Sequence, residues 1–295
     1  MINYQEITCK TACHKITGFL PYCWDLNVYR GCGHGCTYCF ALYSHKYINS
    51  GNFFDEIFVK TNIAERLEKQ LSGKNWKREV VNLGGVTDSY QPAEEKYKLM
   101  PEILKMLIKY KTPAVISTKS KLILRDYNLI DELSRTASVN VACTITTVNE
   151  KVRELIEPNA ASSSERFEVL KAFSKTNASV GLHSMPVIPY LTDNYENIRE
   201  LFAKAQECGV NYIITDLLNL RGQTRVVFFE FIKNKLPHLY NKLYPVYKTA
   251  YVNKEYKEHF KQMASKLRIQ YPLKNKKKHF NKQVSDDQPK QLSLF

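Results

Sequence analysis

The sequence predicts an α/β protein built on a parallel sheet, and three observations lead to this fold class. Six short segments rich in Val, Ile and Thr alternate with helical segments between about residues 24 and 236. Each strand-like segment is bounded by Gly, Pro or Asn, and the hydrophobic content of 44% is enough for a sizeable core. Strands that alternate with helices form parallel βαβ units, so an open doubly wound sheet or a partial barrel is expected.

The elements follow one another in a regular order. Strands are expected at residues 24–29, 80–86, 114–118, 139–146, 179–188 and 212–218. Helices are expected at residues 62–71, 93–110, 129–135, 164–175 and 194–207. Ser162 and Glu165 form a capping-box pattern before the fourth helix, and Gly209 is a typical stop after the fifth. Either architecture places its functional residues at the carboxyl ends of the strands.

The chain divides into four expected parts. After residue 236 the strand pattern ends, and Tyr- and Lys-rich helical segments follow at 239–246 and 252–267. From Pro272 the chain is polar and Lys-rich, with too little apolar content to fold alone. We therefore expect an N-terminal extension at 1–23, the β/α domain at 24–236, a helical extension at 237–271 and a disordered basic tail at 272–295.

The composition indicates the cellular compartment and the kinds of binding partner that we expect. The sequence has no secretory signal and no apolar run near the roughly eighteen residues of a membrane helix, so we expect a cytoplasmic protein with no membrane partner. In that reducing compartment the eight cysteines are expected as ligands, reactive thiols or core residues rather than disulfides. The net charge of +14 favours a polyanion such as nucleic acid, although the Lys- and Tyr-rich composition of an AT-biased organism would look similar.

The most informative stretch is Gly31-Cys-Gly-His-Gly-Cys-Thr-Tyr-Cys39, which follows the first expected strand. Cys32, Cys36 and Cys39 have C-x3-C-x2-C spacing, and thiolates are the usual ligands of iron–sulfur clusters. Three ligands on a [4Fe–4S] cluster leave one iron open, and the interspersed glycines let the backbone approach a bulky inorganic core. The alternative is a closed zinc site completed by His34 or by Cys9, Cys13 or Cys23.

This motif resembles that of the radical S-adenosylmethionine (radical SAM) superfamily. With the downstream sequence Gly85-Val-Thr-Asp-Ser-Tyr-Gln-Pro-Ala-Glu94, it is most similar to the spore photoproduct lyase-like branch, often described as DNA repair photolyases. The resemblance covers roughly residues 8 to 240. It implies a partial (β/α)6 radical SAM barrel with a helical C-terminal extension, and it implies a [4Fe–4S] cluster and S-adenosylmethionine (SAM) as cofactors.

The resemblance also implies roles for single residues. Cys32, Cys36 and Cys39 would ligate the cluster, and SAM would chelate the open iron. The remaining positions would contact SAM: Gly84, Gly85 and Thr87 at the methionyl amino group, Lys119 at the carboxylate and Thr144 at the ribose. A lysine cation suits a carboxylate, and threonine hydroxyls suit polar groups such as an amine or a ribose. Glycines let the cofactor approach the backbone closely. Without the cysteine motif, Lys119 would be read as a solvated loop lysine and Thr144 as an ordinary strand residue.

One position departs from the branch. Spore photoproduct lyase has a hydrogen-donating cysteine at the end of the second strand, and Val86 stands there in this sequence. Cys143, on the expected fourth strand, is the candidate replacement, and its alternative is a buried core cysteine. Asp88 and Tyr90 in the same strand-end loop are weaker candidates for contacts to the substrate or around the site.

These expectations combine into a function. The reduced cluster would cleave SAM to methionine and a 5′-deoxyadenosyl radical, which would abstract hydrogen from a damaged DNA base flipped into the barrel. An electron donor such as a flavodoxin or ferredoxin would supply the electron, and the basic, Tyr-rich C-terminal extension would hold the phosphates. The alternatives are a radical SAM enzyme acting on RNA or another macromolecule, and a non-catalytic metal-bound module that binds nucleic acid.

The last five residues suggest a further partner. Gln291, Leu292, Ser293, Leu294 and Phe295 resemble the pentapeptide with which bacterial DNA polymerases and repair proteins bind the sliding clamp. Leu294 and Phe295 would fill an apolar pocket while Gln291 hydrogen-bonds at its edge. A flexible segment before this motif would tether the enzyme near DNA and raise its effective concentration there. Clamp binding also favours DNA over RNA as the substrate.

Overall fold

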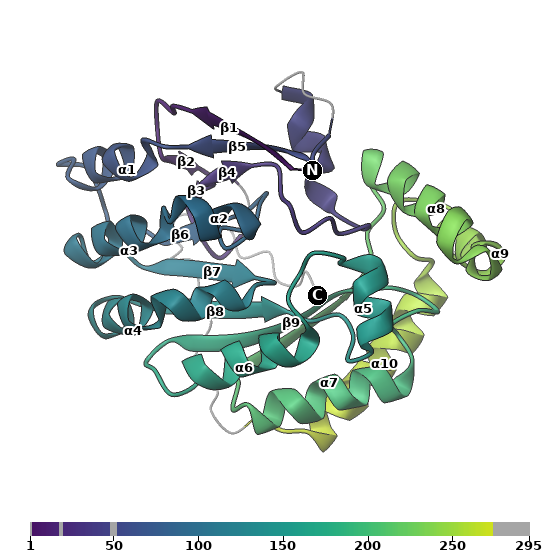
Figure 1. Cartoon of the computed structure of the whole chain (residues 1–295). Helices are drawn as coiled ribbons and strands as arrows, with labels where there is room; N and C mark the ends of the chain where they lie inside the picture. Colours follow the sequence, from purple (N-terminus) through teal and green to yellow (C-terminus); the bar gives the residue numbers. More distant parts are fainter. Residues whose placement is uncertain (1, 18–19, 48–51, 274–295) are drawn as a thin grey trace.

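A computed structural model describes residues 2–17, 20–47 and 52–273, and its centre is a seven-stranded sheet (Figure 1). Six of its strands are parallel and follow the sequence in the order β3, β6, β7, β8, β9 and β10. Their bounds are Trp24–Leu26, Val81–Leu83, Ala114–Thr118, Val139–Thr144, Ser179–Val187 and Tyr212–Leu217. The short strand β2 (Cys13–Lys15) pairs antiparallel with β3 at the edge. The predicted α/β class and the six parallel strands of a partial barrel are confirmed.

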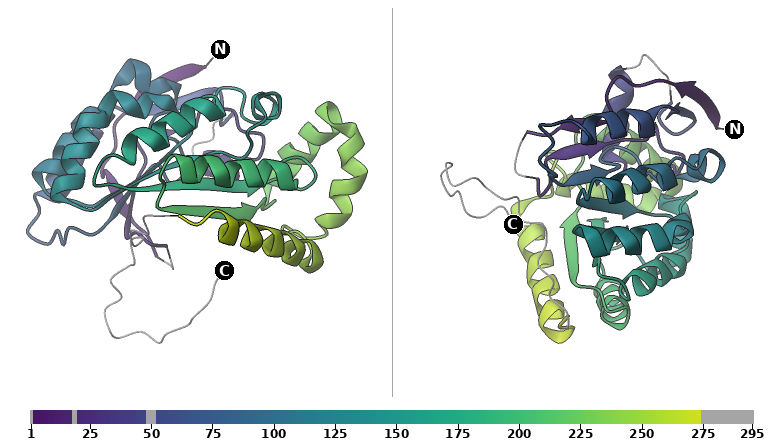
Figure 2. Two further views of the ribbon diagram at one scale, coloured as in Figure 1. Left: turned by 90° about the horizontal axis from the view of Figure 1, so that it is seen from below. Right: turned by 90° about the vertical axis from the view of Figure 1, so that its left-hand side faces the viewer.

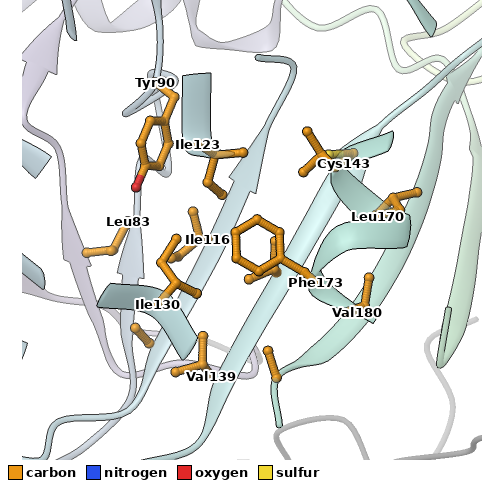
Figure 3. Packing of buried hydrophobic residues seen from close by; sticks show 14 of the residues in the cluster. Leu83, Tyr90, Ile116, Ile123, Ile130, Val139, Cys143, Leu170, Phe173 and Val180 are labelled. Atoms are coloured by element: carbon orange, nitrogen blue, oxygen red, sulfur yellow. The ribbon is translucent and has the colours of Figure 1, made fainter. Parts of the chain in front are cut away.

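Helices cover one face of this sheet (Figure 2). They are α1 (Ile63–Leu71), α3 (Met100–Lys109), α4 (Tyr127–Thr136), α6 (Ser163–Phe173) and α7 (Tyr195–Glu207). The main hydrophobic core lies between these helices and the sheet, and Figure 3 shows Leu83, Ile116 and Val139 of the strands packed towards Ile130 and Phe173 of the helices. Burial of this apolar surface is the main stabilising contribution to the fold.

A second, three-stranded sheet lies beside the first and was not predicted. It consists of β1 (Asn3–Ile7), β5 (Glu56–Lys60) and β4 (Tyr29–Arg30), in the order β1-β5-β4. The single strand predicted at 24–29 is therefore wrong in detail, because β3 belongs to the large sheet and β4 to the small one. The parallel pairing of β1 with β5 joins segments about fifty residues apart, which local sequence patterns do not reveal.

The helix predicted at 93–110 is two helices. The first, α2 (Pro92–Tyr97), ends at Lys98, which has a left-handed backbone with φ of 50°, and α3 begins at Met100. The Glu94 carboxylate accepts hydrogen bonds from the backbone N–H groups of Leu99 (3.1 Å) and Met100 (3.0 Å), which fixes the break. Two further helices, α5 (Glu150–Ile156) and α8 (Gln223–Lys235), and the 3-10 segments η1 (Phe40–Tyr47) and η2 (Lys121–Asp126) were also not predicted.

The C-terminal part contains α9 (Pro237–Val246) and α10 (Lys254–Gln270). Helices α8 and α9 form a hairpin beyond the carboxyl ends of the strands, whereas α10 runs beside α7 (Figures 1 and 2). The division of the chain at residues 23, 236 and 271 stays a prediction. In the described part of the chain, no helix combines the length and apolarity that spanning a membrane requires.

Candidate active site

The cysteine loop directly follows β4 at the mouth of the barrel, which we define as the carboxyl ends of the six parallel strands with their loops. Gly31 begins the loop with φ of +81°, and a Cβ there would lie 2.5 Å from the carbonyl oxygen of Glu56. Glycine at this position is therefore required by contact with the small sheet as well as by its conformation. The Cys32 N–H donates to the Phe53 carbonyl (3.0 Å), and the Cys39 N–H donates to the Cys36 carbonyl (3.2 Å).

Side chains from two distant loops hold the backbone of the cysteine loop. Gln91, which is fully buried, accepts from the Gly33 N–H (2.9 Å) and donates to the Gly31 carbonyl (3.0 Å). Asn159 donates to the Gly33 carbonyl (2.8 Å), and its backbone N–H donates to the His34 carbonyl (3.2 Å). Because Gln91 and Asn159 belong to other loops of the folded chain, contacts within the protein hold the cysteine loop in this conformation.

Asp88 is the central polar residue of the mouth. Its buried carboxylate lies 3.0 Å from His34 Nε2 and accepts hydrogen bonds from the Thr118 hydroxyl (2.8 Å) and the Lys119 and Tyr90 N–H groups (2.8 Å each). Burial alone would raise the pKa of Asp88, but His34 and the N–H donors lower it to about 2. Asp88 thus ties the cysteine loop to the end of β7, whereas its sequence position predicted only a weaker candidate for contacts to the substrate or around the site.

The three cysteines lie within electrostatic reach of one another. Burial raises the pKa of Cys32 to about 12 and also raises the pKa values of Cys36 and Cys39, and the charges of the neighbouring thiolates add to the rise for Cys32 and Cys36. Cys36 is buried, whereas Cys32 and Cys39 are partly exposed. Buried thiols become thiolates when a metal supplies the positive charge, so this donor set fits an iron–sulfur cluster.

Three of the four residues named for the zinc alternative, His34, Cys9 and Cys13, have other contacts in the structure. Both ring nitrogens of His34 lie near protein acceptors, at 3.0 Å from Asp88 Oδ2 and 3.3 Å from the Asn159 carbonyl. Cys13 packs in the main core on β2, and Cys9 packs against the same core.

The end of β6 forms a narrow cradle beside the cysteine loop. Gly84 has φ of +95°, and a Cβ on Gly85 would lie 2.5 Å from the carboxylate of Asp25. Asp25 accepts from the Gly85 N–H (3.1 Å), and Asn27 accepts from the Val86 N–H (3.0 Å), so both side chains of the first strand region fix this turn. Thr87 is buried, and its hydroxyl has no hydrogen-bond partner among the described residues.

Lys119 and Thr144 end the two following strands. Lys119 Nζ lies 5.9 Å from the centroid of the Tyr38 ring, and it makes no hydrogen bond or ion pair within the described residues. Burial acts to lower the pKa of Lys119, but the negative charges of Cys36, Glu157 and Asp88 raise it above its usual range, so the side chain stays cationic. Thr144 is buried at the end of β8, and its carbonyl accepts from Arg166 (2.7 Å).

A buried ion pair supports this side of the mouth. Arg166 Nη2 lies 2.5 Å from Glu157 Oε2, and neither side chain is exposed. Glu157 also accepts from the Tyr38 hydroxyl, next to Cys36. The Thr87 hydroxyl, the cationic Lys119 and the glycine cradle follow β6 and β7 at the mouth, and these are the types of group that suit a zwitterionic ligand such as SAM. Sequence reasoning missed Asp25, Arg166 and Glu157, because no local pattern marks residues whose partners are distant in the chain.

Cys143 faces away from this region. Side chains alternate along β8, so Val139, Val141 and Cys143 point to the helices while Asn140 and Thr144 point to the lumen, the interior side of the barrel. Figure 3 shows Cys143 near Leu170 in the apolar core, where it is fully buried. The expectation that Cys143 is a hydrogen donor finds no support in this position.

Other residues do face the lumen. The Tyr212 hydroxyl donates to Asn140 Oδ1 (2.9 Å) and lies 3.2 Å from His183 Nε2. Val86 lies at the mouth and packs against the same apolar cluster as Cys32 and Cys39. The pentapeptide at 291–295 lies outside the described residues.

Comparisons with known proteins agree with this site. Residues 26–202 match the radical SAM superfamily. The chain is 33% identical to the uncharacterized protein Rv2578c of Mycobacterium tuberculosis, over 92% of this chain and 82% of that protein. It is 29% identical to the uncharacterized protein MJ0683 of Methanocaldococcus jannaschii, over 73% of this chain and 77% of the relative.

Among solved structures, a spore photoproduct lyase mutant with bound AdoMet and dinucleoside spore photoproduct has a TM-score of 0.65 at 11% identity, covering 91% of this chain and 79% of that one. SuiB of Streptococcus suis bound to its precursor peptide SuiA has a TM-score of 0.54 at 14% identity, covering 85% and 47%. At these identities the likeness concerns the fold. The family match, the 33% identical relative and the three-cysteine loop show that the chain belongs to the radical SAM superfamily, whose cofactors are an iron–sulfur cluster and S-adenosylmethionine.

Proposed function

We propose that this radical SAM enzyme acts on a damaged base in DNA, as a lyase of the spore photoproduct lyase type. The observation that carries the proposal is the position of the three-cysteine loop, at the mouth of the barrel and beside the basic hairpin of α8 and α9. When bound, the cofactors supply a 5′-deoxyadenosyl radical through one-electron cleavage of SAM, with the electron from a flavodoxin or ferredoxin. The protein binds, orients and shields the reactants.

Different residues of the mouth would bind the cluster and the separate groups of SAM. Cys32, Cys36 and Cys39 would hold the cluster. Thr87, with its unpartnered hydroxyl, and the carbonyls of Gly84 and Gly85 would bind the methionyl amino group. Lys119 would pair with the carboxylate and Thr144 would contact the ribose. The fit rests on Thr87, whose buried hydroxyl lacks a hydrogen-bond partner among the described residues, since leaving such a group unpaired costs about 1–3 kcal/mol.

DNA is favoured over other substrates by charge and by the fold neighbour. The net charge of +14 suits a polyanion, and spore photoproduct lyase has been solved with a dinucleoside spore photoproduct. Val86 supplies no S–H, so the final hydrogen transfer must use a different donor from the cysteine of that enzyme. The lesion is therefore proposed to differ from the spore photoproduct while the radical chemistry is shared.

The test is an anaerobic assay with ultraviolet-irradiated DNA, the same DNA without irradiation and an RNA of the same sequence. The reconstituted protein is reduced, and 5′-deoxyadenosine and lesion content are measured, with Cys36→Ala as the inactive control. Lesion loss only with irradiated DNA supports the proposal. Turnover of RNA alone would move the enzyme to the RNA alternative, and absence of 5′-deoxyadenosine in every arm would favour the non-catalytic module.

We also propose that Gln291, Leu292, Ser293, Leu294 and Phe295 bind the bacterial sliding clamp, which would place the enzyme at replicating DNA in the cytoplasm. The pattern of one glutamine and three large apolar residues supports this docking. A titration of the full chain and of a chain lacking residues 291–295 against a purified clamp tests it. Binding that disappears on truncation is expected, and equal behaviour of the two proteins would rule the motif out.

A further inference from the structure

The hairpin of α8 and α9 concentrates positive charge. Residues 221–254 contain seven Lys or Arg and a single acidic residue, Glu230, and the basic residues are Arg221, Arg225, Lys233, Lys235, Lys242, Lys248 and Lys254. Except for Arg225, which is partly buried, all of them are exposed. Residues 221–254, which comprise α8, α9 and the residues that flank them, therefore carry a net charge of +6 (seven basic minus one acidic residue) out of the total of +14.

Aromatic rings are interleaved with these cations. Tyr240 and Tyr244 lie one helical turn apart on α9 and stack with centroids 5.6 Å apart and an angle of 28° between their planes. Lys233 Nζ lies 4.9 Å from the Tyr240 ring, and the Arg225 guanidinium lies 5.9 Å from the Tyr244 ring. Tyr244 is 52% exposed, so an aromatic ring of this stack is open to a ligand.

A second cation–aromatic pair continues the same surface. The Arg221 guanidinium lies 5.1 Å from the ring of Tyr251, which is 47% exposed. Arg225 joins the two pairs, because its guanidinium donates to the carbonyls of Thr249 (3.0 Å) and Tyr247 (2.8 Å) in the segment that leads to Tyr251. We name the set of Arg221, Lys233, Lys235, Tyr240, Tyr244 and Tyr251 the basic aromatic surface.

The surface is attached directly to the cysteine loop. The Thr224 hydroxyl, next to Arg225, donates to the Cys39 carbonyl at 2.9 Å, and Val227 packs in the same apolar cluster as Cys39. Phe228 and Phe229 of α8 lie in one buried cluster with Cys36 and Tyr38. A ligand on this surface is thus held at a fixed place relative to the mouth of the barrel.

We propose that the basic aromatic surface binds an unpaired stretch of DNA strand, with bases stacked on Tyr244 and Tyr251 and phosphates neutralised by Arg221, Lys233 and Lys235. The charge selects a polyanion, and exposed rings beside cations select one whose bases are free to stack, which a closed duplex does not offer. The inference rests on the proposed function, because an unpaired strand at the mouth is what delivers a base to the barrel.

The test is the binding of labelled oligonucleotides to the reconstituted holoenzyme by fluorescence anisotropy. The ligands are a 20-nucleotide DNA strand, its duplex, the RNA of the same sequence and a poly-glutamate peptide. The protein variants are Tyr244→Ala/Tyr251→Ala and, as a matched control, Tyr195→Ala, which removes a tyrosine that is 47% exposed on α7. A second pair compares Lys233→Glu/Lys235→Glu on α8 with Lys171→Glu/Lys175→Glu at the end of α6.

We expect the DNA strand to bind more tightly than the duplex and the peptide. The double tyrosine variant should lose at least about tenfold in affinity, since stacking stabilises each bound base by roughly 1–3 kcal/mol. The Lys233→Glu/Lys235→Glu variant should weaken binding and reduce the slope of log affinity against log salt by about 1.4 or more. Equal losses in the control variants, tighter binding of duplex or peptide, or tighter binding of RNA would overturn the proposal.

Formation of 5′-deoxyadenosine from SAM without DNA separates this inference from the proposed function. It should be unchanged in the tyrosine and lysine variants, because none of these residues lies among the proposed cofactor contacts. Strand binding without lesion turnover would refute the proposed repair activity alone, whereas lesion turnover that survives in the double tyrosine variant at wild-type affinity would refute the surface alone.

Discussion

The two faces of β8 meet different surroundings although their residues alternate along one strand. Towards the helices, Val139, Val141 and Cys143 join the apolar core, whereas towards the lumen Asn140 contacts Tyr212 and Thr144 ends at the proposed SAM site. Apolar burial on the helix side stabilises the fold without placing a reactive group. On the lumen side and at the mouth, buried polar groups are kept in place by specific partners such as Asp88 and Arg166.

This difference predicts how large the effect of a substitution on stability is and whether the substitution also alters the cofactor site. A change at the mouth leaves a buried polar or charged group without its partner. Such a loss lowers the free energy of unfolding and affects the position of that particular group. Changes on the helix side remove dispersion contacts and leave the cofactor site as it was.

The largest effect is expected for Arg166→Ala. It leaves the Glu157 carboxylate buried without its cation, and breaking such a pair costs about 3–5 kcal/mol. Urea unfolding of the purified protein measures the loss. The double variant Arg166→Met/Glu157→Gln, which removes both charges, should recover most of the stability, and a loss below about 1 kcal/mol in the single variant would contradict the role of the pair.

Asp88→Ala should also destabilise the mouth, by about 1–3 kcal/mol, because the donors on Thr118 and Lys119 lose their acceptor. The folded-state pKa of Asp88 is lowered to about 2, so its contribution is fully present above about pH 4 and is lost as the pH falls towards 2. Unfolding midpoints between pH 2 and 5 measure this. Asp88→Asn should lack this component of the acid dependence, and an unaltered pH profile would show that Asp88 is not the group involved.

Lys119→Ala should weaken SAM binding by about tenfold to a hundredfold, the range expected for losing one charge-assisted contact. Iron content should stay at the wild-type level, because the three cysteines are untouched. Isothermal titration with SAM and iron analysis give the two readouts, and Lys121→Ala, an exposed lysine two residues on, is the control. Loss of iron together with SAM affinity would place Lys119 in the support of the cluster instead.

Cys143→Ala should have the smallest effect, a loss of about 1–2 kcal/mol from the core with unchanged 5′-deoxyadenosine formation. Analysis of the products formed from a substrate that the enzyme converts tests whether Cys143 donates the hydrogen. Aberrant or uncoupled products would restore Cys143 as hydrogen donor and break the contrast between the two faces. Unchanged products would leave the transfer to a lumen side chain such as Tyr212.

The six parallel strands and the cysteine loop could be predicted because their signals are local. β8 is a short buried strand rich in the β-branched residues Val and Thr, and three cysteines at this spacing in one loop indicate a metal-binding site. The small sheet and the ties through Asp25, Asp88 and Arg166 could not be predicted in this way. Their partners lie about 20 to 60 residues away in the chain, so only the folded arrangement identifies them.

The most direct test of the account compares Cys36→Ala with Cys143→Ala, since each removes one buried thiol, the first from the cysteine loop at the mouth and the second from the helix side of the sheet. Iron and sulfide content and 5′-deoxyadenosine formation are measured after anaerobic reconstitution with SAM and a reductant. We predict that Cys36→Ala loses the cluster and forms no 5′-deoxyadenosine, whereas Cys143→Ala keeps both at the wild-type level. Cleavage of SAM by Cys36→Ala, or loss of the cluster in Cys143→Ala, would contradict the assignment of the site.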